Sequence, residues 1–299
     1  MTLTMTERRP RRWAHARSGP LFLLPSALII CTFVLYPIVQ SLWMSLHDWS
    51  MFQVVHPFIG LSNYAELLGD PRFWNALLNT AVFTVATVPV QVAVGLLLAV
   101  ALSRSSWWAV LLRSVYFFPV ISSFATMAIV WRFLLSADVG PTASWLRALG
   151  VTPLDWLHST VWALPAVIMV GLWKNIGFTM VILLAALQDV PESLNEAAVL
   201  DGATRWQRFI HVTIPSIRHA LLFTSVIAVI ASLQVFDQVY VMTRGGPLFH
   251  TETLVTYMYE QGFTEFRSGY AAAIAWVLFV LIMLVSVVQL RLFRYKDVD

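Results

Sequence analysis

The residues best able to bind a polar molecule lie at the centres of two long apolar runs. The midpoint of the run at about 161–187 falls at Lys174, and that of the run at about 219–242 falls near Ser232. Polar groups at membrane depth are costly, so their presence indicates a function. Hydrogen-bonding groups beside aromatic faces suit a sugar. The predicted substrate path consists of Lys174, Asn175, Phe178, Ser232, Gln234 and Asp237.

The same polar residues have a second interpretation, which is purely structural. They could form hydrogen bonds between helices, and a Lys174–Asp237 ion pair could hold two spans together. Gln91, which lies near a proline, and the pair Ser122–Ser123 are weaker candidates for the path. A proline in a span can simply mark a kink. The sequence leaves both interpretations open.

Sequence patterns for catalysis and for cofactor binding are missing. The only lysines, Lys174 and Lys296, follow no G-x-x-x-x-G-K-[ST] loop, and neither H-E-x-x-H nor G-x-S-x-G occurs. Cys31 is the only cysteine, which excludes an intrachain disulfide and a cysteine metal cluster. The seven histidines are scattered. We therefore predict no catalytic residue, no metal ligand and no cofactor bound by this chain.

A polar segment at about 188–218 separates two of the apolar runs. Ser193-x-x-Glu196 has the pattern of a capping box, which predicts a helix beginning at Ser193. Gly202 is suited to end that helix, because glycine adopts the left-handed backbone of a C-terminal cap. Thr204-x-x-Gln207 predicts a second capped helix. The segment is therefore expected to fold as two short helices joined by a turn.

The second of these short helices would carry an apolar patch formed by Trp206, Phe209 and Ile210. Such a patch could dock into a groove on another protein. It could equally fold back against its own bundle. Physical reasoning on the sequence alone favours neither outcome.

The composition indicates a membrane protein. Hydrophobic residues make up 59% of the chain and charged residues only 12%, whereas soluble domains contain about 25% charged residues. Long apolar runs must form helices in lipid, where all backbone polar groups need internal partners. The fold class expected is all-α and polytopic, with six spans at about 21–45, 77–102, 110–135, 161–187, 219–242 and 270–292.

The distribution of basic residues predicts that both termini are cytoplasmic. With this orientation 13 basic residues lie inside and 5 outside, which follows the positive-inside rule. The outer five are Arg72, Arg132, Arg147, Arg244 and Arg267. The basic N-terminal segment adjoins a span, so we predict no nucleic-acid binding and an uncleaved first helix. The predicted domains are a cytoplasmic segment 1–19, one transmembrane domain 20–294 and a cytoplasmic tail 295–299.

Residues in the 188–218 segment carry a family resemblance. They match a pattern E-A-A-x-x-x-G-A, followed by an aromatic residue and then I-x-L-P, with isoleucine in place of the more usual leucine before the proline. The matching residues are Glu196, Ala197, Ala198, Gly202, Ala203, Phe209, Ile214 and Pro215, with Asp201 before the glycine. The segment resembles the EAA loop of binding-protein-dependent ABC importer permeases.

Further stretches resemble the carbohydrate-uptake branch of these permeases, and the resemblance extends from about Pro20 to Arg294. These stretches are Leu35–Pro37, Gly60–Tyr64, Trp173–Phe178, Ala186–Pro191, Phe236–Asp237 and Met242–Pro247. The resemblance implies the type I importer permease fold in the inner (cytoplasmic) membrane. Non-sugar importers and, more distantly, ATP-independent carriers remain alternatives.

The resemblance also implies the partners. They are a second, different permease, two ATP-binding subunits that use ATP and Mg, an extracytoplasmic solute-binding protein and membrane lipid. In similar proteins the EAA loop forms a coupling helix in a cleft of the ATPase subunit. The coupling role would fall to Glu196, Ala197, Ala198, Asp201, Gly202, Ala203 and Phe209, with Glu196 facing a basic residue of the ATPase.

Overall fold

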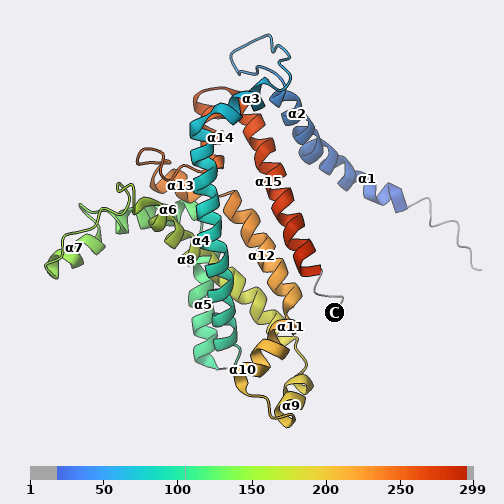
Figure 1. Ribbon diagram of the computed structural model, residues 1–299, viewed down its shortest axis with the longest axis vertical. Coiled ribbons are helices and arrows are strands. Elements are labelled where there is room, and N and C mark those ends of the chain that lie inside the picture. The colour runs from blue at the N-terminus through green and yellow to red at the C-terminus, as the bar shows by residue number, and fades with distance from the viewer. Residues whose placement is uncertain (1–18, 105, 295–299) are drawn as a thin grey trace, which may run out of the picture.

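The computed structural model describes residues 19–104 and 106–294, and this part of the chain is helical (Figure 1). It contains no strand, only an isolated bridge between His47 and Phe58. The predicted N-terminal segment 1–19, except for Gly19, and the predicted tail 295–299 lie outside the described residues. The all-α class is therefore confirmed for the part that the structure describes.

Most connections between the helices are short, but the segments 46–61, 149–162 and 243–253 are longer. In the part of the chain that the structure describes, three π-helical turns occur, at Cys31–Leu35, Phe209–Thr213 and Glu260–Thr264. The α-helices are α1 Gly19–Ile30, α2 Tyr36–Ser45, α3 Ser62–Gly69, α4 Pro71–Ala101, α5 Trp107–Ile121, α6 Phe124–Leu134, α7 Pro141–Ala148, α8 Ala163–Gln188, α9 Glu192–Leu200, α10 Arg205–Arg208, α11 Ile214–Ser216, α12 Arg218–Leu233, α13 Asp237–Met242, α14 Leu254–Tyr259 and α15 Ser268–Arg294.

The described chain contains several apolar helices long enough to cross a membrane. Five candidates lie at Leu23–Ser45, Pro71–Ala101, Ala163–Gln188, Arg218–Met242 and Ser268–Leu292, and Arg218–Met242 is interrupted by the non-helical residues 234–236. A sixth candidate exists if α5 and α6 together count as one span. The prediction of six apolar spans agrees with this set at five positions.

The predicted third span, 110–135, is wrong as a continuous helix. The chain leaves the helix at Ser122 and Ser123, whose ψ angles are 148° and 131°, and α6 then runs at 102° to α5. Pro119 lies in the last turn of α5 and lacks an N–H group, so it weakens the helix just before the break. Hydropathy measures apolar content and does not detect such an interruption.

The long helices pack side by side, with α4, α8, α12 and α15 forming the body (Figure 1). One buried cluster joins α4, α12, α14 and α15, a second joins α4, α6, α8 and α13, and a third joins α4, α5 and α8. Helix α1 points away from the body, and its span has no buried residue in the most apolar window. Helix α2 contacts α15, where Trp276 donates a hydrogen bond to Ser41 at 3.0 Å.

The end of the bundle that carries α3 and α14 is held together by a polar cluster. Arg72 binds the buried carboxylate of Glu252 at 2.7 Å and also contacts Glu260. Asp70 accepts hydrogen bonds from the hydroxyls of Tyr257 and Tyr270. The opposite end carries α9 and α10 (Figure 1).

The Asp70 carboxylate makes the stability of this end depend on pH. Burial on its own would raise the pKa of Asp70, but the hydrogen bonds from Tyr257, Tyr270 and backbone N–H groups lower it below its usual 3.8. A lowered pKa stabilises the fold above the usual value, and this stability is lost as the pH falls through the folded-state pKa. We expect Asp70→Asn to weaken the acid dependence of the thermal unfolding midpoint between pH 5 and pH 3. An unchanged pH profile would contradict this assignment.

Candidate solute path and docking helix

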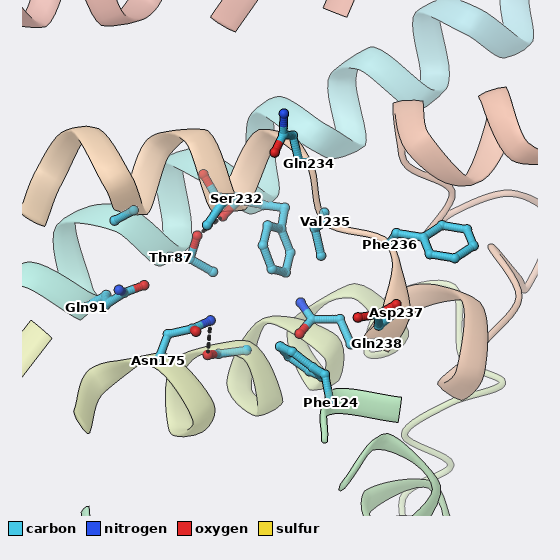
Figure 2. Close-up of a pocket in the computed structure, with 14 residues that line it drawn as sticks. Thr87, Gln91, Phe124, Asn175, Ser232, Gln234, Val235, Phe236, Asp237 and Gln238 are labelled. Carbon is cyan, nitrogen blue, oxygen red and sulfur yellow. Dashed lines mark hydrogen bonds between the residues drawn. The ribbon is translucent and has the colours of Figure 1, made fainter. Parts of the chain in front are cut away.

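A cavity of about 200 Å³ lies between α4, α6, α8, α12 and α13, next to the break between α12 and α13 (Figure 2). It is lined by Phe83, Thr87, Gln91, Phe124, Gly171, Asn175, Ala228, Ala231, Ser232, Gln234, Val235, Phe236, Asp237 and Gln238. Asp237 is the only charged side chain among these. The cavity therefore offers amides, hydroxyls, aromatic rings and one carboxylate.

The structure brings four of the six predicted path residues to this cavity. They are Asn175, Ser232, Gln234 and Asp237. The chain between Leu233 and Asp237 is not helical, and in Figure 2 the Gln234 amide points away from the side chains of Asn175 and Gln238. Phe178 is 38% exposed and is not part of the cavity lining.

Lys174 also lies outside the cavity lining, and its ammonium group binds backbone carbonyl oxygens instead. Its Nζ donates to the carbonyl oxygens of Pro119 at 2.7 Å, Val120 at 3.1 Å and Ser122 at 2.7 Å. An ammonium group has three N–H donors, so these contacts occupy all of them. The alternative Lys174–Asp237 ion pair does not form.

Gln238 is a lining residue that the sequence did not single out. It is 2% exposed, and its Oε1 atom has no hydrogen-bond partner among the residues that the structure describes. Figure 2 shows the amide extending toward the side of the cavity that carries Asn175. Buried polar atoms are normally paired, so this acceptor remains available to a hydrogen-bond donor in the cavity. Its only sequence signal is its position beside Asp237.

Two other amides at the cavity are fixed by a single bond each. Asn175 Nδ2 donates to the Gly171 carbonyl at 3.0 Å, and Gln91 Nε2 donates to Thr179 Oγ1 at 2.9 Å. A side-chain amide carries two N–H donors and one acceptor oxygen. Within the described chain each of these amides therefore keeps further hydrogen-bonding capacity. Gln91, a weaker candidate in the sequence, belongs to the cavity lining.

Helix α9 stands clear of the bundle at the end opposite α3 and α14 (Figure 1). None of its residues is buried, and Leu200 is 88% exposed. Gly202 has a φ of 77°, and the N–H groups of Gly202 and Ala203 donate to the carbonyls of Val199 and Ala198. This is the Schellman arrangement that ends a helix, so the prediction for Gly202 is confirmed.

The predicted capping box at Ser193 is wrong, whereas the one at Thr204 is confirmed. Helix α9 begins at Glu192 with Pro191 at the N-cap, and no side chain caps it. Ser193 is already helical there. Thr204 and Gln207 form both bonds of a capping box at the start of α10. Of the patch residues, Trp206 is 68% exposed, whereas Phe209 is half-buried and lines a hollow together with Val100 and Leu187 of the bundle, so the patch is only partly packed against the bundle.

Residues 61–295 match a family model that is described as "Binding-protein-dependent transport system inner membrane component". The chain belongs to this family. The permease is therefore a multi-pass membrane component of an ABC importer.

Two curated relatives are similar over nearly their whole length. The "Lactose transport system permease protein LacF" of Rhizobium radiobacter is 35% identical, covering 96% of the permease and 97% of the relative. The "Trehalose/maltose transport system permease protein MalF" of Thermococcus litoralis is 30% identical, covering 95% and 96%. The permease thus matches proteins of its own size.

A solved structure shows the same fold. It is a chain of a bacterial ABC transporter involved in the import of the acidic polysaccharide alginate, with a TM-score of 0.82 at 23% identity. The match covers 94% of the permease and 96% of that chain. The type I importer permease fold expected from the sequence is confirmed.

Proposed function

We propose that the permease moves a sugar or sugar-like solute across the cytoplasmic membrane by alternating access, as part of an ATP-driven, binding-protein-dependent importer. The observation that carries this proposal is the polar cavity within an otherwise apolar bundle. Amide, hydroxyl and aromatic groups line it, and these are the groups that bind an uncharged polyol. Relatives named for lactose and for trehalose and maltose support the same solute class.

A second permease is proposed to complete the path. The cavity measures about 200 Å³, which is below the roughly 300–1,000 Å³ of a typical ligand site. The span containing α1 and α2 also has an unburied apolar window. A different sister subunit would cover apolar surface and supply the remaining wall of the cavity.

Coupling to ATP is proposed to act through the EAA loop, with α9 as the docking helix. Glu196, Ala197, Ala198, Asp201, Gly202, Ala203 and Phe209 are the residues assigned to this contact. A short helix with exposed apolar side chains suits a groove on another protein. ATP and Mg would be bound by the two ATPase subunits, so closure of those subunits would rock the spans between two states.

The end that carries α3 and α14 is proposed to receive the solute-binding protein. The 244–253 loop is fixed to α4, because Asn75 and Asn79 both donate to the Phe249 carbonyl. Leu248 at the tip of this loop is 81% exposed. A rigid loop with an exposed apolar tip fits a protein contact.

Gln238 provides a test of the path. We expect Gln238→Leu to raise the KM for uptake at least about tenfold, which corresponds to one lost hydrogen bond of about 1.4 kcal/mol. The thermal unfolding midpoint should stay the same or rise, because the substitution removes an unpaired buried acceptor. Val90→Leu on the exposed face of α4 is the control. An unchanged KM would exclude Gln238 from the path.

Purification of the tagged chain from its native membrane in mild detergent tests the proposed assembly. Mass spectrometry should identify an ATPase and a second, different permease in the same complex. Recovery of the chain alone, under conditions that preserve known complexes, would reopen the carrier alternative.

A further inference from the structure

The break between α5 and α6 exposes backbone carbonyls in the middle of the molecule. A helix leaves its last carbonyl groups without partners in its own ladder. Val120 and Ser122 supply such carbonyls where α5 ends, beside the carbonyl of Pro119, which already accepts from the Ser122 N–H at 3.3 Å. In the interior of a membrane protein these groups need other donors, since water is absent.

Lys174 supplies those donors from α8. Its ammonium group contacts all three carbonyls within 3.1 Å, and the residue is only 7% exposed. Its positive charge also faces the negative end of the α5 dipole. The Nζ atom lies 5.3 Å from the ring centroid of Phe124, the first residue of α6. Lys174 therefore contacts both sides of the break.

Gly177 brings the two helices together one turn further along α8. A Cβ atom at this position would lie 2.0 Å from the carbonyl oxygen of Tyr116, far inside any permitted contact. The backbone of α8 thus touches that of α5 directly. With Lys174 and Gly177 as two neighbouring contacts, α8 and the end of α5 are held as one unit.

One end of this unit lies next to the docking helix α9, and the other end lies at the cavity. Helix α8 ends at Gln188 and α9 begins at Glu192, so three residues separate them (Figure 1). At the other end, Phe124 lines the cavity (Figure 2). A displacement of α9 carried along α8 would reach the break and then the cavity wall.

We propose that Lys174 is a positioning residue that links the docking helix α9 to the cavity by fixing the α5–α6 break to α8. This inference rests on the proposed function, because it assumes that α9 moves with the ATP cycle. Lys174 acts through the backbone and Phe124 and makes no contact with the solute.

The test measures how fast a cysteine introduced at the α5–α6 break is labelled in two states of the ATP cycle. Ser123 is exposed, and its side chain forms no capping bond, so Ser123→Cys in a Cys31→Ser background is a mild reporter. The full complex with its binding protein is treated with a small membrane-permeant maleimide, either nucleotide-free or trapped with Mg-ATP and vanadate. With Lys174 present, the labelling rate should differ at least about threefold between the two states, as expected for a shift between two conformations.

Lys174→Met removes the charge and the N–H donors while keeping an unbranched apolar stem. We expect the ratio of the two labelling rates to fall to about one, with ATPase and sister permease still recovered. Lys174→Arg should restore most of the ratio, and Met169→Ala, an exposed position on the same helix, should not change it. If Lys174→Met does not assemble, Lys174→Gln replaces it and should lower the ratio.

Each outcome of this test has one meaning. A nucleotide-dependent ratio that survives in assembled Lys174→Met overturns the linkage and leaves the proposed function intact. A ratio of one with Lys174 present, in a complex that still imports solute, overturns the linkage as well. Failure of the proposed function would instead appear as a chain that recovers no ATPase and shows no ATP-dependent uptake.

Discussion

Glu196→Lys is expected to reduce solute uptake to background while membrane insertion stays normal. Glu196 is exposed on α9, a helix with no buried residue, so the substitution disturbs no packing in the described chain. The reversed charge would face the basic residue that the family resemblance places on the ATPase, and like charges at a contact cost several kcal/mol. Uptake by cells and the amount of chain in the membrane are the two measurements.

The matched control is Asp138→Lys. Asp138 is also an exposed acidic residue, but it lies between α6 and α7, away from α9 and from the end that carries α3 and α14. It should retain normal uptake. Normal uptake by Glu196→Lys would remove the basis for assigning α9 as the docking helix.

Gly177→Ala is expected to destabilise the permease severely. The added methyl group would lie 2.0 Å from the Tyr116 carbonyl oxygen, and backbone atoms cannot yield as a flexible side chain would. Forcing extra volume into a packed contact costs about 1–3 kcal/mol and occasionally more. The expected results are a lower thermal unfolding midpoint in detergent and less assembled complex.

Gly69→Ala is the control for this effect, because a Cβ atom at Gly69 meets no atom within 4 Å. It should leave both the midpoint and the yield unchanged. A Gly177→Ala protein as stable as the unmodified chain would mean that α5 and α8 do not touch as closely as described.

Sequence reasoning was most successful where composition decides the outcome. Long runs without charge can only form helices in lipid, so spans such as Pro71–Ala101 and Ser268–Leu292 were predictable. The turn at Gly202 and the cap at Thr204 were also predictable, because each depends on residues within one turn. Features that depend only on neighbouring residues can therefore be predicted from the sequence.

The features that failed depend on distant contacts or on competition between neighbours. The break at Ser122 is stabilised by Lys174, which lies 52 residues away in the chain. Lys174 was correctly placed in the apolar interior, but its partners are backbone carbonyls, which no sequence pattern marks. At α9, Pro191 starts the helix before Ser193 because proline suits a helix N-terminus and the negative charge of Glu192 favours its first turn.

The cavity also shows that contacts between distant residues are not predictable from the sequence. Asn175, Ser232, Gln234 and Asp237 were predicted from their depth in two apolar runs, and the structure brings them to one cavity. Gln238 was missed because its significance is an unpaired oxygen in a buried position. Only the arrangement of the neighbouring helices shows that no partner is present within the described chain.

The most direct test of the central claim is solute uptake by the purified complex in proteoliposomes, with the binding protein outside and nucleotide inside. The probe is the sugar that mass spectrometry finds bound to the co-purified binding protein. The proposal predicts uptake with Mg-ATP, and none with a non-hydrolysable analogue or without the binding protein. Uptake that continues at the same rate without ATP would contradict it and identify the chain as a carrier.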